Sequence, residues 1–96
     1  MKPAPLQPRV QVFVCAHARA PDDPLRSGCG EAGPAVFAAL KDATLRSAGS
    51  VWITRTGCMG LCPPRGCSVV VEPDHRHYVE VEADDVPRLL NTLKSP

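Results

Sequence analysis

Short runs of alternating apolar and polar residues indicate strands in this chain, and apolar positions at helical spacing indicate helices. Residues 10–15 alternate and are rich in β-branched side chains, which is typical of a strand, and residues 51–56 show the same character. Residues 68–72 and 77–82 are two further strand-like runs around a Pro-Asp pair, which predicts a hairpin. The pattern therefore predicts four strands.

Two segments have the apolar spacing of helices. The first starts near Pro34, a residue favoured in the first helical turn, and Gly49 is well placed to end it. The second follows Asp84, a candidate cap residue, and carries Pro87 in its first turn, where proline is tolerated. The predicted order is strand, helix, strand, strand, strand, helix, an α/β arrangement whose first three elements form a βαβ unit with parallel strands.

Two loops rich in glycine and proline separate these elements, at residues 16–33 and 57–66. A connection as long as the first loop is uncommon in a compact domain and is usually functional. Residues 1–8 contain three prolines and no periodicity, so we expect a flexible tail. Residues 9–96 are then one small domain.

Composition narrows the function classes. The 44% hydrophobic and 22% charged residues are typical of a folded globular domain, and a formal net charge of +1 gives no reason to expect nucleic acid or an anionic membrane as partner. The N-terminus lacks the apolar region of a secretory signal, and no apolar run approaches the roughly 20 residues that span a bilayer. We expect a cytoplasmic protein. The sequence shows no nucleophile–base pair and no phosphate-binding loop, so we expect no enzymatic activity.

Five cysteines in 96 residues are the strongest chemical signal. In a reducing compartment, clustered cysteines more often bind metal or do redox chemistry than form disulfides. Cys15 ends the first strand and Cys29 lies in the first loop, while Cys58 and Cys62 lie in the second loop. Because parallel strands end at the same edge of a sheet, these thiols can converge on one point.

The spacing of the cysteines favours an iron–sulfur cluster over other centres. Structural zinc usually takes C-x2-C pairs and stays a minor alternative, and a thioredoxin-type redox pair needs a C-x-x-C motif that is absent. A Rieske centre needs two histidines, but only His17, two residues after Cys15, lies near a cysteine of the set in the sequence. Glycines beside the cysteines allow backbone N–H groups to approach anionic sulfur.

The chain resembles the thioredoxin-like [2Fe–2S] ferredoxins, the bacterial Shethna-type family. Two motifs carry most of the resemblance, Ser27-Gly28-Cys29-Gly30 and Gly57-Cys58-Met59-Gly60-Leu61-Cys62. It covers roughly residues 9 to 94 and includes the stretches 12–15, 24–33, 57–62, 68–73, 78–81 and 84–87.

The resemblance implies both a fold and a role. The fold would be thioredoxin-like, with a mixed four-stranded sheet, two main helices and two cluster-binding loops. Cys15, Cys29, Cys58 and Cys62 would be the ligands of one [2Fe–2S] cluster per chain. The protein would be a homodimer that carries one electron between a reductase and an acceptor enzyme, both of them redox partner proteins.

One departure from the family pattern concerns Cys67, which stands where the family usually has proline. We expect that Cys67 begins the third strand and is not a ligand. The departure leaves an alternative function open: a small metal-binding or redox-sensing protein with a regulatory cluster or another metal. Trp52 is expected to have a packing role rather than one in electron transfer.

Overall fold

A computed structural model of the chain describes residues 1–5, 8–17, 32–45, 50–60 and 65–93. The elements in these residues follow the predicted order and confirm the α/β prediction. They are β1 (Val10–Cys15), α1 (Ala32–Thr44), β2 (Val51–Thr56), β3 (Cys67–Glu72), β4 (Arg76–Val81), the 3₁₀ helix η1 (Ala83–Asp85) and α2 (Val86–Leu93).

The four strands form one mixed sheet in the order β2-β1-β3-β4. β1 and β2 are parallel and in register from Val10 opposite Val51 to Cys15 opposite Thr56. β3 runs antiparallel to both β1 and β4. The predicted βαβ unit is therefore confirmed, because α1 connects two parallel, adjacent strands.

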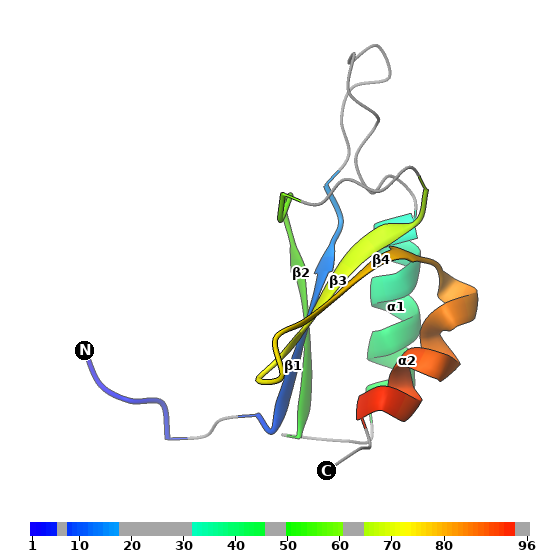
Figure 1. Cartoon of the computed structure of the whole chain (residues 1–96). Coiled ribbons are helices and arrows are strands. Elements are labelled where there is room, and N and C mark those ends of the chain that lie inside the picture. The colour runs from blue at the N-terminus through cyan, green and yellow to red at the C-terminus, as the bar shows by residue number, and fades with distance from the viewer. Residues whose placement is uncertain (6–7, 18–31, 46–49, 61–64, 94–96) are drawn as a thin grey trace.

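Both α-helices lie on one side of the sheet (Figure 1). Along β1, the side chains of Val12 and Val14 are buried on the helix side, while Gln11 and Phe13 between them are only half-buried. Val36 and Leu40 of α1 and Leu89 and Leu93 of α2 join the same core from the helix side. Full burial of one such side chain stabilises the fold by about 1.5–3 kcal/mol.

The opposite face of the sheet carries Trp52, which is 40% exposed. Trp52 is the register partner of Gln11, and half-buried Phe13 lies two residues further along β1. Within the described residues Trp52 is not part of the buried core, and its predicted packing role stays a prediction.

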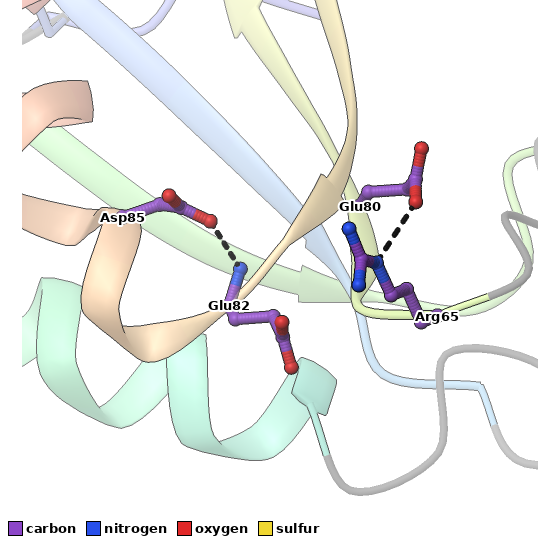
Figure 2. A network of polar contacts seen from close by, with 4 residues as sticks. All are labelled: Arg65, Glu80, Glu82 and Asp85. Atoms are coloured by element: carbon purple, nitrogen blue, oxygen red, sulfur yellow. Dashed lines mark hydrogen bonds and ion pairs between the residues drawn. The ribbon is translucent and has the colours of Figure 1, made fainter.

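The ends of the helices differ from the sequence prediction. α1 begins at Ala32, two residues before the predicted start, and Gly49 lies outside the described residues. Asp84 does not cap α2, because the 3₁₀ turn of η1 precedes that helix. Instead the Glu82 N–H donates to Asp85 Oδ2 at 2.9 Å (Figure 2). Among the described residues, neither helix is long and apolar enough to cross a membrane.

Candidate metal centre

Three cysteines of the described chain lie at one edge of the sheet. β1 ends at Cys15, β2 ends two residues before Cys58, and Cys67 is the first residue of β3. Because β1 and β2 are parallel and β3 runs opposite to them, these chain positions share the upper edge in Figure 1. The edge that the sequence predicted for the thiols is therefore confirmed for Cys15 and Cys58.

The pairing of β1 with β2 persists up to this edge. Cys15 is the register partner of Thr56, and the Ala16 N–H donates to the Thr56 carbonyl oxygen at 3.0 Å. The backbone at Cys15 is thus held by the last residue pair of the two parallel strands. Cys15 is only 2% exposed, whereas Cys58, two residues beyond Thr56, is exposed.

The turn after β2 directs a backbone donor at a thiol. The Gly60 N–H donates to Cys58 Sγ, with a nitrogen–sulfur distance of 3.3 Å. Met59, between them, is half-buried and packs against the core. Met59 therefore anchors the turn while the thiol faces outward. An N–H aimed at sulfur stabilises the thiolate, the form that binds iron.

The first turn of α1 packs directly on the backbone of Cys15. A Cβ added at Gly33 would collide with the Cys15 carbonyl oxygen and would lie 2.7 Å from Ala16 Cα. Only glycine permits this approach without movement of the helix. The N-terminus of α1, which carries a partial positive charge, is thereby fixed beside Cys15.

Arg65 and Gly66, at the return of the second loop, lie against β4. Gly66 is buried, and the Arg65 side chain forms an ion pair with Glu80. The sequence identified Gly66 only as part of a loop, and it gave no signal for Glu80. The contact joins residues that are far apart in the chain, so local patterning does not report it.

Cys29 and Cys62, the other two predicted ligands, lie outside the described residues. Within the described ranges, no group of three or more His, Cys, Asp and Glu side chains is arranged to hold a metal ion. The structure thus brings Cys15 and Cys58 to one edge, and the four-ligand set as a whole stays a prediction. Cys67 is fully buried in the core and pairs with Val81, which confirms its place at the start of the third strand.

Comparison with known proteins gives matches among solved structures. No protein-family model and no curated protein matches the chain. The wild-type thioredoxin-like [2Fe–2S] ferredoxin from Aquifex aeolicus is 32% identical, with a TM-score of 0.78 over 88% of this chain and 84% of that one. Another structure of a ferredoxin of this type from Aquifex aeolicus is 33% identical, with a TM-score of 0.80 over 91% of this chain and 82% of that one. A cysteine-to-serine variant of the Aquifex protein is also similar, with 32% identity and a TM-score of 0.79 over 88% of this chain and 87% of that one.

The mixed four-stranded sheet, with both helices on one face and cysteines at one edge, defines a thioredoxin-like α/β domain, as the resemblance implied. At 32–33% identity over most of both chains, the protein belongs to the family of thioredoxin-like [2Fe–2S] ferredoxins.

The contact between α1 and Cys15 predicts the effect of Gly33→Ala. The added methyl group must push α1 away from the end of β1, so we expect the free energy of unfolding to fall by about 1–3 kcal/mol. Gly57→Ala is the matched control, because a Cβ there meets nothing within 4 Å. Urea unfolding of both variants checks the prediction, and equal midpoints would contradict the tight contact.

Proposed function

We propose that this protein carries single electrons on a [2Fe–2S] cluster between a reductase and an acceptor enzyme. The observation that carries the proposal is the edge where buried Cys15 lies beside the β2 turn and where the Gly60 N–H donates to Cys58 Sγ at 3.3 Å. Membership of a ferredoxin family supports the same role. The cluster would supply reversible one-electron chemistry, and the chain itself needs no catalytic group.

The proposed ligands are Cys15, Cys29, Cys58 and Cys62. Cys29 precedes the start of α1 by three residues, and Cys62 precedes Arg65 by three. Because three residues span at most about 11 Å, this spacing is compatible with both thiols reaching the edge that holds Cys15 and Cys58. Two cysteine-to-serine variants of the Aquifex ferredoxin have been solved at positions four residues apart. Cys58 and Cys62 have the same interval.

The residues at this edge suit an anionic cluster. A cluster with four thiolates has a net negative charge, and reduction adds one more. The Gly60 N–H and the N-terminus of α1 beside Cys15 both present positive partial charge. These dipoles would stabilise the negative charge of the reduced cluster.

The proposal includes the setting in which the protein works. A reducing cytoplasm keeps the ligand thiols from forming disulfides. The near-neutral net charge of +1 favours protein partners over nucleic acid or anionic membranes. The partners would therefore be redox proteins.

We further propose that the protein is a homodimer, as the family resemblance implies. The face of the sheet that carries no helix supports this assembly, because Trp52 is 40% exposed there. Gln11, Phe13 and Trp52 line one shallow hollow on this face. Aromatic side chains of this kind are enriched in protein interfaces.

The first test is chemical and spectroscopic. We expect the anaerobically purified protein to be red-brown, with two irons and two inorganic sulfides per chain, EPR-silent as isolated and EPR-active after dithionite. Four thiolate ligands predict a potential around −400 mV, as in plant-type ferredoxins. Stoichiometric zinc without sulfide would refute the cluster, and a cluster that is lost on reduction would favour the redox-sensing alternative.

The second test assigns the ligands. We expect Cys67→Ser to keep a full [2Fe–2S] spectrum, because Cys67 is fully buried within β3 and is not one of the proposed ligands. Serine at any of the four proposed ligands should shift the spectrum or lower the iron content. Loss of the cluster in Cys67→Ser, together with a native spectrum in Cys62→Ser, would show that the assignment of the second loop is wrong.

The third test concerns the dimer. Sedimentation velocity should give a dimer for the wild type and a monomer for Trp52→Glu, since a buried carboxylate on this face would be desolvated without a partner. Asn91→Glu is the matched control, because Asn91 is exposed on α2, which lies on the other side of the sheet, and the change should leave the dimer intact. A monomeric wild type would refute the assembly.

A further inference from the structure

Glu80 has an unusual backbone conformation for a residue within a strand. Its φ is +57°, in the left-handed region that is unfavourable for residues other than glycine. His75 has the same φ but lies in the turn between β3 and β4, where such values are ordinary. A conformation of this kind persists only where its surroundings enforce it, and it is common at functional sites.

Gly66 is the surrounding group that meets Glu80. Gly66 is buried and has a φ of +69°. A Cβ at Gly66 would lie 2.6 Å from the Glu80 carbonyl carbon, 2.8 Å from Glu80 Cα and 2.9 Å from the Val81 nitrogen. The two backbones are thus in direct contact, and both residues adopt positive φ where they meet.

The residues on either side of Gly66 are attached to the same strand. Arg65 Nε lies 3.1 Å from Glu80 Oε1 (Figure 2), and Cys67 is the register partner of Val81. The pairing of β3 with β4 is irregular immediately after this point, between Cys67 and Val69. Three consecutive residues are therefore fixed to β4 where the chain returns to the sheet.

We propose that Gly66 and Glu80 are positioning residues for the iron–sulfur cluster. Their backbone contact, with the ion pair of Arg65, fixes the segment from which the chain extends back to Cys62, which lies three residues before Arg65. The tether to Cys62 is at most about 11 Å long, so a shift of this anchor changes the position available to the ligand. The inference rests on the proposed function.

The experiment compares variants of the cluster-loaded protein. The readouts are the rate of cluster loss to an iron chelator, the visible circular dichroism of the cluster and the urea midpoint. Gly66→Ala forces a methyl group into backbone at positive φ, and we expect cluster loss about tenfold faster or more, with an altered dichroism spectrum. Glu80→Gln removes only the exposed ion pair, so we expect cluster loss about threefold faster.

Glu80→Gly separates positioning from general stability. Glycine relieves the left-handed conformation, so the urea midpoint should stay the same or rise, while loss of the ion pair should still speed cluster loss about threefold. A residue that contributed only to fold stability would change both readouts in the same direction. If Gly66→Ala does not fold, the rates of cluster loss and the urea midpoints of Glu80→Gly and Glu80→Gln still test the positioning role.

Two controls complete the design. Asp74→Asn removes an exposed ion pair with Arg76 near the turn between β3 and β4, away from the cysteine edge, and should leave cluster loss unchanged. The exchange Arg65→Glu with Glu80→Arg restores an ion pair in reverse and should return cluster loss toward the wild-type rate.

The outcomes distinguish this inference from the proposed function. A wild-type protein without a cluster would overturn the proposed function and the inference together. A wild-type protein with a cluster, combined with wild-type loss rates in the Glu80 variants, would overturn the inference alone. Equal acceleration in Asp74→Asn would also overturn it, because the effect would then not depend on the contact with Gly66.

Discussion

The parallel pairing of β1 with β2 is the constraint on which the site depends. Six consecutive register pairs hold these strands together, and the last pair contains Cys15. Parallel neighbours require a crossover, which α1 provides by packing Val36 and Leu40 against the sheet. One hydrophobic surface therefore stabilises the fold and also positions the proposed ligands. The same burial that aligns the two strands places both of their carboxyl ends at one edge.

Close backbone contacts secure that edge on two sides. Gly33 brings α1 against the Cys15 carbonyl, and Gly66 brings the return of the second loop against Glu80. A side chain at either glycine would force these segments apart. A small domain has few buried side chains to hold a loop, so backbone packing at glycine is an effective way to fix one.

The sequence predicts the parts of the fold that have a buried face. The bounds of β1 and β2 agree with the alternating pattern, because a slip of one residue would turn the apolar side chains of Val12 and Ile53 into solvent. Long-range contacts are what local patterning misses. The positive φ of Glu80 lies where the register of β3 against β4 is irregular and where Gly66 meets the strand, and the 3₁₀ turn is capped by Asp85 rather than by Asp84.

The two described thiols of the proposed site differ in environment, and the difference bears on electron transfer. Cys15 is 2% exposed and adjoins the core, whereas Cys58 is exposed and accepts the Gly60 N–H. At Cys15 burial opposes added negative charge while the N-terminus of α1 favours it, whereas at Cys58 both solvent and the N–H dipole favour it. For a cluster held by both thiols, the charge added on reduction is therefore better stabilised on the Cys58 side. That side is also the one that a redox partner can approach without disturbing the core.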